Sequence, residues 1–266
     1  MKILIAIVLL SSSIFAKVYY AKVEPYEIRD ISSNVSGLVL YADEDLVGTT
    51  LLQKPYIKID SILDTKELGF IKEKLSYIKE MLLENENILI NLDNSLKRKR
   101  INYEKVSKLK FKSSVEKDKE FYDLITSENT YLNTKKEIQN LKLQITDLKL
   151  RIAQLQRSIS DKNLVAPNFI LYEMIVKPGK VVSIGTPLAK IADASKAKLT
   201  IYLDEIDVKD SDKKTVYIDG EKTNYKISRM LNIADSKNIS KYMAQIIIDA
   251  PKLFSKLVKI ELIDEQ

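Results

Sequence analysis

The feature that most limits how this chain can fold is a stretch of 97 residues, 70–166, that contains neither glycine nor proline. All six glycines and all six prolines of the chain lie outside it. Glycine and proline are the strongest breakers of regular structure, so a stretch rich in Leu, Ile, Lys and Glu without them predicts long helices. The sequence on either side predicts short strands and turns. We therefore expect an α+β chain whose β body is split by a long helical insert.

Two apolar seams divide the insert into two helices. Leucines recur at intervals of seven from Leu68 to Leu96, and a second series of the same spacing runs through 124–159. Sustained seams of period 3.5 are typical of coiled coils. The two helices could form an antiparallel hairpin, or each could pair with another chain. One hairpin register, which places Leu75 opposite Leu148, aligns the two seams throughout and centres the turn between Phe111 and Lys112. A slip by one heptad would centre it near Val115, and either way the turn lies within about 109–117. Each arm would then be about 65–70 Å long.

The predicted seam changes character along its length. Near the root the layers are aliphatic, whereas toward the tip Lys99 lies opposite Leu124 and Tyr103 lies opposite Glu120. Polar groups at seam positions cost stability and persist where they set the register or contact something else. Two interpretations stay open: the far end frays, or the tip is a docking surface that a partner completes.

The N-terminus is typical of a secretory signal peptide. Lys2 precedes an unbroken apolar run from Ile3 to Leu10, and Ala16 supplies the small residue before a cleavage site. The whole segment is shorter than the roughly 20 residues that span a bilayer. We therefore expect cleavage after residue 16 and an exported, soluble mature protein.

The composition argues against an enzyme. The chain has no cysteine and no histidine, which excludes disulfides and thiolate chemistry and removes the commonest general base and metal ligand. We find no nucleophile–base pair and no cluster of metal ligands, and expect no catalytic, cofactor or metal site. The net charge of +6 comes mainly from lysines of the helical region, and we interpret it as a solvated helix face. Nucleic acid is not an expected partner, because aromatic and basic residues do not alternate as single-strand binding requires.

The segments that flank the insert predict β structure. Residues 35–59 and 163–191 share a strand–turn–strand rhythm, and each is too short to bury a sound core alone. We expect them to pack together as one β-sandwich from which the hairpin projects. From residue 198 onward, five or so strands and a short helix predict a small β-barrel. The acidic residues of 204–210 could hold a cation, but an exposed helix start with Asp204 as the N-cap is the favoured interpretation.

The order of these parts resembles a known family. The residues that carry the resemblance are Val35-Ser36-Gly37-Leu38-Val39, Ala166-Pro167, Lys177-Pro178-Gly179-Lys180-Val181-Val182, Gly185-Thr186-Pro187-Leu188, Tyr202-Leu203-Asp204-Glu205-Ile206-Asp207 and Ala234-Asp235-Ser236-Lys237. In this order around a heptad hairpin, they resemble the periplasmic adaptor subunits, or membrane fusion proteins (HlyD-like family), of tripartite efflux pumps and type I secretion systems.

The resemblance implies a division of the chain into parts. These are a signal peptide (1–16), an N-terminal strand with the first half of a lipoyl-like domain (17–61), a coiled-coil hairpin (62–162, tip about 109–117), the second lipoyl-like half (163–194) and a β-barrel domain (195–266). No lipoyl group is expected, because the hairpin takes the place of the modified turn. Two possibilities stay open for a membrane-proximal domain. A reduced form could be built from 17–26 and the C-terminus, or the domain could be missing.

The resemblance also implies a function. The chain would be a non-catalytic periplasmic adaptor, present in hexamer-like assemblies, that links an inner-membrane transporter (ABC or proton-driven) to an outer-membrane channel. Export of small molecules is the favoured role, because type I secretion adaptors usually begin with a transmembrane helix, whereas this sequence predicts a cleaved signal peptide without an anchor. The alternatives are a type I protein-secretion adaptor and a free-standing structural coiled-coil protein of the periplasm.

The hairpin tip is the expected partner-binding site. Tips of the family often carry an Arg, a Leu four residues on and a Ser seven further, and anchoring this pattern on Ser113 places Asn102 and Val106 at the other two positions. Serine and an apolar residue are kept, whereas asparagine replaces the arginine. The expected site residues are Asn102, Val106, Lys110, Lys112, Ser113, Ser114, Val115 and Glu116.

Overall fold

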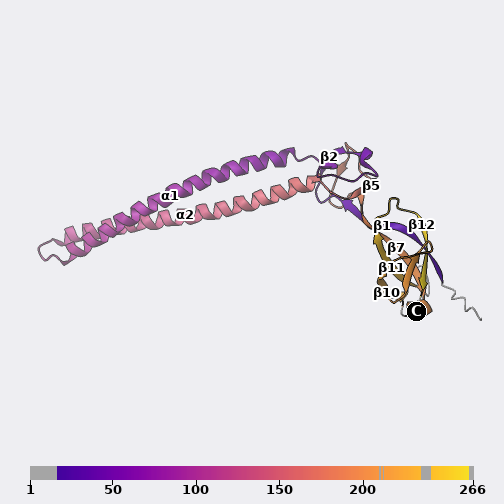
Figure 1. Cartoon of the computed structure of the whole chain (residues 1–266). Helices are drawn as coiled ribbons and strands as arrows, with labels where there is room; N and C mark the ends of the chain where they lie inside the picture. Colours follow the sequence, from indigo (N-terminus) through magenta and orange to yellow (C-terminus); the bar gives the residue numbers. More distant parts are fainter. Residues whose placement is uncertain (1–16, 210, 212, 235–240, 264–266) are drawn as a thin grey trace, which may run out of the picture.

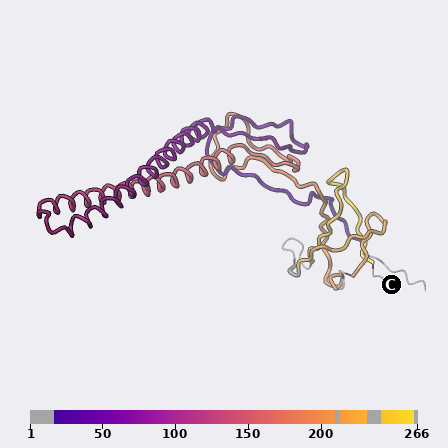
Figure 2. The backbone as a smooth tube through the Cα atoms, turned by 60° about the vertical axis from the view of Figure 1, so that its left-hand side comes forward, coloured from indigo at the N-terminus to yellow at the C-terminus, as the bar shows by residue number. Residues whose placement is uncertain are grey.

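The computed structural model describes residues 17–209, 211, 213–234 and 241–263. The expected signal peptide therefore lies outside the described residues. The described chain forms three parts that follow one another in space: a long helical hairpin, a small β body at its root and a second β body beyond it (Figures 1 and 2). We call these the hairpin, the upper body and the lower body. The predicted α+β class and the helical hairpin are both confirmed.

The hairpin consists of α1 (Ile62–Lys108) and α2 (Ser114–Lys162), joined by 109–113. With 47 and 49 residues, the helices are each about 70 Å long. Some contacts between the helices lie within one residue of the expected register, whereas others, such as the ion pair of Glu86 with Lys142, lie several residues from it. Lys99, expected opposite Leu124, forms an ion pair of 2.9 Å with Asp123.

The seam is packed along its length, from Leu155 near the root to Leu96 toward the tip. Its fully buried side chains are Leu96, Ile138, Leu141, Ile145 and Leu155. The root residues Leu68 and Ile71, although aliphatic, are only half-buried. Leu75, Ile78 and Leu82 further along α1 are half-buried as well, so this partial exposure is not particular to the root.

The upper body is built from both sides of the helical insert. Strands β2 (Gly37–Ala42), β3 (Ile57–Ile59), β4 (Asn163–Leu164) and β6 (Val181–Val182) form a four-stranded sheet in the order β4-β3-β2-β6. A short 3-10 helix, η1 (Glu44–Leu46), follows β2. Residues 39–59 and 166–191 share one buried core, as expected of segments too short to fold alone.

Two long strands connect the bodies. β1 (Val18–Ser32) and β7 (Pro187–Asp204) pair antiparallel from Val23↔Leu199 to Ser32↔Pro187, and β5 (Ile170–Met174) pairs with the upper part of β7. The expected boundary near residue 194 thus lies inside a continuous strand. A register shift between Pro25 and Glu27 marks the passage from one core to the other.

The lower body is a curled sheet around a second core. Its strands are β8 (Thr215–Ile218), β9 (Glu221–Lys222), β10 (Ile227–Ala234), β11 (Lys241–Asp249) and β12 (Leu257–Ile263), and the sheet order is β10-β11-β7-β1-β12-β8-β9. The N-terminal residues Val18–Lys22 pair with β12 and so belong to this body. A single-turn helix, α3 (Glu205–Val208), follows β7.

The expected β-barrel is not seen as a closed ring. Within the described ranges, no ladder joins the two ends of the sheet, β9 and β10. β9 has only two residues, and β10 carries two register shifts against β11. Closure needs edges with a matching register, and these two edges do not provide one.

Candidate partner-binding site at the hairpin tip

The tip turns through a short loop that is capped on both sides. The Leu109 N–H donates to the Val106 carbonyl at 3.1 Å, which ends α1. Ser113 is the N-cap of α2 and forms a capping box with Glu116: the Glu116 N–H donates to Ser113 Oγ at 3.3 Å, and the Ser113 N–H donates to Glu116 Oε2 at 3.1 Å. The predicted site residue Ser113 therefore uses its hydroxyl to build the turn.

Lys112 completes this cap. Its ammonium lies 2.8 Å from Glu116 Oε1. The hydrogen bond from Lys112, followed by those from the backbone and side chain of Ser113, lowers the pKa of Glu116 to about 2. Glu116 thus stays ionised at any physiological pH, and a negative charge at a helix N-terminus is itself favourable.

The loop presents apolar side chains to solvent. Phe111 is 79% exposed and Val115 is 75% exposed, while Ser114 and Lys110 lie exposed beside them. The surrounding segment 105–119 carries six lysines against two carboxylates. The tip is therefore a basic surface with apolar points at its centre.

Asn102 and Val106 lie one to two turns from the loop. The Asn102 side-chain amide donates to Glu120 Oε2 at 2.9 Å across the hairpin, and Val106 is half-buried between the helices. Nearby, the rings of Tyr103 and Phe121 contact each other in a tilted arrangement, with their centroids 5.7 Å apart. The structure thus brings the expected residues to one end of the hairpin, where Asn102 and Glu116 already have partners within the chain.

Sequence reasoning missed three aromatic residues of this site: Phe111, Phe121 and Tyr122. All three are exposed, and the rings of Phe121 and Tyr122 lie 5.8 Å apart. Their signal was present in the sequence, because four of the chain's aromatic residues fall within 103–122 at the expected turn. Aromatic side chains bring large contact areas to protein interfaces.

The acidic residues after β7 do not form an open cation site. Asp204 is the N-cap of α3, but its side chain makes no capping hydrogen bond. It pairs instead with Lys17, whose ammonium also lies 3.1 Å from Asp207. Asp210 lies outside the described residues. Within the described part of the chain, no group of His, Cys, Asp or Glu is placed to hold a metal ion. In the same part, no helix has the length and apolar character that a bilayer crossing requires.

Comparison with known proteins gives structural neighbours only. No protein-family model and no curated protein matches the sequence. The structure of MacA from Actinobacillus actinomycetemcomitans is similar at a TM-score of 0.64 and 20% identity, over 94% of this chain and 79% of that chain. A putative efflux transporter from Bacteroides eggerthii DSM 20697 matches at a TM-score of 0.55 and 14% identity, over 92% and 68%.

A third neighbour has nearly the same extent as this chain. The membrane fusion protein Spr0693 from Streptococcus pneumoniae R6 matches at a TM-score of 0.54 and 10% identity, over 94% of this chain and 100% of that chain. At identities this low, the TM-scores show a shared fold over most of the chain and no more.

Proposed function

We propose that this chain, which has the fold of the membrane fusion proteins, is a non-catalytic periplasmic adaptor that links an inner-membrane transporter to an outer-membrane channel. Small molecules are the proposed cargo, by analogy with the neighbour described as an efflux transporter. In this proposal the upper body is the split lipoyl-like domain and the lower body is the barrel domain of an adaptor.

The observation that carries the proposal is the placement of the tip. The hairpin holds an apolar and basic surface about 70 Å from the upper body, and the lower body lies at the opposite end (Figure 1). Such a chain can contact two partners that are far apart. A compact enzyme or binding module gains nothing from this length, whereas an adaptor requires it.

The side chains of the tip indicate what kind of partner surface would complement them. Phe111 and Val115 would enter apolar recesses, and the surrounding lysines would face carboxylates. Opposite charges at the rim of an interface mainly raise the association rate and fix the orientation of the partners. We therefore propose that the end of the channel offers apolar recesses rimmed by acidic residues.

Photocrosslinking in cells tests the adaptor role. The probe is p-benzoylphenylalanine at position 111, which replaces an exposed aromatic residue and leaves the Ser113–Glu116 cap intact. The control carries the same probe at Lys72, an exposed position of α1 near the root. A crosslink to an outer-membrane channel protein from position 111 alone is expected. Crosslinks to this chain only, or none at normal expression, would contradict the proposal.

Self-association is part of the proposed role, and the hairpin offers two surfaces for it. Exposed apolar side chains form one stripe on α1, with spacings of seven and four, and another on α2, with spacings of seven and eleven. The α1 stripe is Leu63, Phe70, Tyr77, Met81 and Ile88; the α2 stripe is Ile125, Leu132, Leu143 and Leu150. Two different stripes suit a head-to-tail contact between neighbouring copies, which generates a ring when the rotation closes. We propose a hexamer-like ring of this kind.

Sedimentation of single and mixed variants tests this contact. Phe70→Glu alters only the α1 stripe and Leu143→Glu only the α2 stripe; both side chains are exposed, so neither change should unfold the chain. Each variant alone should fail to form rings, whereas an equal mixture should form dimers through the one contact that stays intact. If only one variant disrupted assembly, the contact would be symmetric, as in a free-standing coiled-coil dimer.

A further inference from the structure

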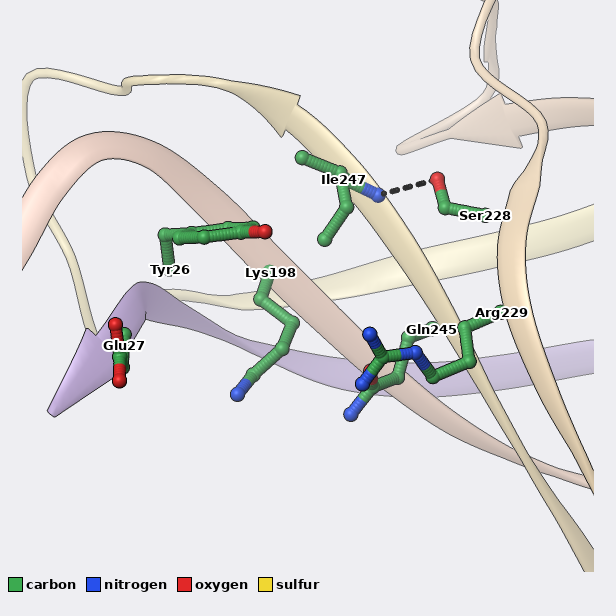
Figure 3. Close-up of a pocket in the computed structure, with 7 residues that line it drawn as sticks. All are labelled: Tyr26, Glu27, Lys198, Ser228, Arg229, Gln245 and Ile247. Atoms are coloured by element: carbon green, nitrogen blue, oxygen red, sulfur yellow. Dashed lines mark hydrogen bonds between the residues drawn. The ribbon is translucent and has the colours of Figure 1, made fainter.

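A cleft of about 490 Å³ lies on the outer face of the lower body, where β1 passes toward the upper body. Four adjacent strands line it: β1 with Tyr26 and Glu27, β7 with Lys198, β10 with Ser228 and Arg229, and β11 with Gln245 and Ile247 (Figure 3). We call it the junction cleft, because Tyr26 and Glu27 belong to the register shift at which β1 leaves the lower core. Its size is within the range of small-molecule sites.

Strand alternation explains why polar groups gather here. On β7, Ala197 and Leu199 point into the core, so Lys198 between them points outward. On β11, Ala244 and Ile246 are buried, which turns Gln245 and Ile247 to the same outer face. Cross-strand register then places Lys198 beside Ile247 and Arg229 beside Gln245.

The lining of the cleft holds two cations, Lys198 and Arg229, against one carboxylate. Glu24, which lies opposite Lys198 in the β1–β7 ladder, is outside the lining. Within the described part of the chain, neither Lys198 nor Arg229 forms an ion pair or donates a hydrogen bond to a carboxylate. Glu27 is the one carboxylate of the lining, and it is bound to Arg29 at 2.7 Å. That hydrogen bond lowers the pKa of Glu27, and the charge of Lys198 contributes in the same direction. The cleft therefore keeps an excess of positive charge.

Apolar surface and neutral donors complete the lining. Figure 3 shows the ring of Tyr26 beside Lys198, with the side chain of Ile247 further along the same face. Ser228 Oγ accepts the Ile247 N–H at 3.3 Å, so this hydroxyl is already engaged. The amide of Gln245 projects next to the guanidinium of Arg229 (Figure 3), and both can donate hydrogen bonds to one bound oxygen-bearing group.

We propose that the junction cleft binds a small organic anion, with a phosphate or carboxylate held by Arg229, Lys198 and Gln245 and an apolar body against Tyr26 and Ile247. Arg is suited to this role, because its planar fork binds two oxygens of such a group at once. This site lies in the lower body, apart from the hairpin tip, and does not depend on the adaptor role. The anion can be a soluble molecule or the head group of a lipid.

Nuclear magnetic resonance titration of the full chain tests the site, with phenyl phosphate as the soluble probe. Backbone amides near 198, 229 and 245 should shift with millimolar saturation, and inorganic phosphate should bind at least fivefold more weakly because it lacks the apolar body. Equal binding of the two probes would overturn the organic part of the proposal. Shifts spread over other surfaces would overturn the site, and an absence of shifts would exclude a soluble ligand of this kind.

Variants distinguish binding in the cleft from attraction of the anion to general surface charge. Arg229→Gln and Lys198→Gln should each weaken phenyl phosphate binding at least fivefold, and Arg229→Lys should restore part of it. Lys226→Gln, which removes an exposed charge just outside the lining, should leave binding unchanged. Equal losses in all of these variants would overturn the assignment.

A second arm of the experiment identifies the source of the anion. The chain is mixed with vesicles of phosphatidylglycerol and, separately, of phosphatidylcholine. Sedimentation with the anionic vesicles that depends on Arg229 would support the proposal with a lipid head group as the ligand. Binding of phenyl phosphate without binding of vesicles would support it with a soluble ligand. Failure of both arms would overturn it, and none of these results bears on crosslinking at the tip.

Discussion

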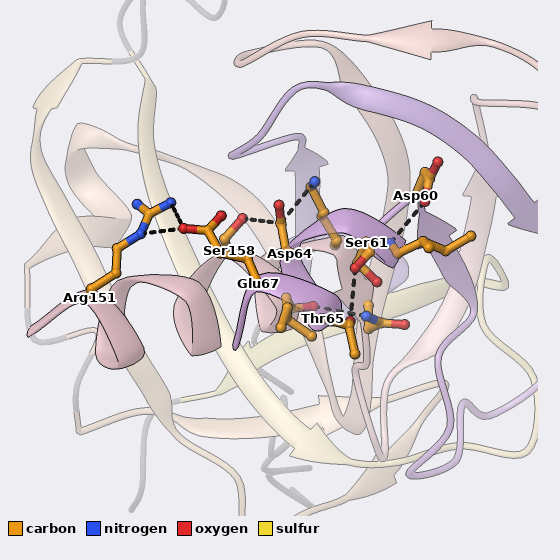
Figure 4. Close-up of polar contacts among 11 residues, drawn as sticks. Asp60, Ser61, Asp64, Thr65, Glu67, Arg151 and Ser158 are labelled. Carbon is orange, nitrogen blue, oxygen red and sulfur yellow. Dashed lines mark hydrogen bonds and ion pairs between the residues drawn. The ribbon is translucent and has the colours of Figure 1, made fainter. Parts of the chain in front are cut away.

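Asp64 of α1 and Lys162 of α2 form an ion pair of 2.9 Å where the two helices meet the upper body. Ser158 Oγ donates to the same carboxylate oxygen of Asp64 at 2.8 Å, and one turn further along, Arg151 Nε donates to Glu67 at 2.8 Å (Figure 4). Asp64 and Lys162 are only 22% and 14% exposed. The root of the hairpin, whose apolar seam is partly open, is thus closed by polar contacts between the helices.

Asp64→Asn should lower the free energy of unfolding by about 1–2 kcal/mol, because it leaves a mostly buried ammonium without its counter-charge. Burial alone would raise the pKa of Asp64, but the hydrogen bonds from Lys162 and Ser158 hold it below the ordinary value of 3.8. The contribution is therefore complete above pH 4 and is lost as the pH falls below that value.

Chemical denaturation followed by circular dichroism at pH 7 measures this loss. Asp147→Asn is the control, since Asp147 is an exposed carboxylate of α2 that forms no ion pair with another described residue. Equal stability of the two variants would show that the root pair contributes nothing.

Glu116 should titrate with a pKa of about 2, below its ordinary value of 4.5, mainly because of its hydrogen bond from Lys112. A depressed pKa means that the cap of α2 is fully stabilising above pH 4.5 and weakens as the pH falls toward 2. Carboxyl-carbon resonance measurements give the midpoint directly. In Lys112→Met the midpoint should rise; a midpoint near 4.5 in the unmodified chain would refute the geometry of the cap.

Leu141→Ala should destabilise the hairpin by about 2–4 kcal/mol, because Leu141 is only 1% exposed and its truncation leaves a cavity in the seam. Leu143→Ala, two residues along the same helix, removes the same atoms from a side chain that is 65% exposed. It should change the stability by less than about 0.5 kcal/mol. Thermal melts of the helical signal, at a concentration where the chain is monomeric, compare the two. Similar losses of stability in both variants would show that Leu141 is not part of the buried seam.

Gly37→Ala should cost about 1–3 kcal/mol, since the added Cβ would lie 2.7 Å from Ile59 Cγ2 and Ile59 is fixed in the upper core. Gly69→Ala is the matched control, because no atom lies within 4 Å of the Cβ that it would add. Alanine also has the higher helix propensity. It should stabilise α1 by about 0.5–1 kcal/mol. Denaturation midpoints that shift in the same direction for both variants would contradict this contrast.

The hairpin could be predicted from the sequence because its information is local. A seven-residue spacing such as Leu68, Leu75 and Leu82 specifies both helix and seam within a few turns. The β8–β9 turn was predictable for the same reason. Asp219 and Gly220 both adopt positive φ, of 50° and 87°, as a two-residue hairpin of this type requires.

The solvent exposure of the tip residues was harder to predict from the sequence. Ser113 was identified by its position, but its capping box with Glu116 follows from the N-cap pattern of any helix start, and the sequence alone did not separate this local role from a role in binding. The solvent exposure of Phe111 depends on how the loop between α1 and α2 closes, and that path is set by the pairing of the two helices.

By itself, the sequence determined the α+β class, the two long helices and their register, because periodicity and breaker residues act over a few turns. Only the tertiary structure decided that Val18–Lys22 joins β12, that β7 continues through both bodies, and that Lys198 and Arg229 meet at one cleft. The physical reason is sequence separation: Tyr19 pairs with Ile260, and nothing near either residue specifies such a partner. Long-range strand pairing is selected by the burial of a whole face, which exists only once the chain has folded.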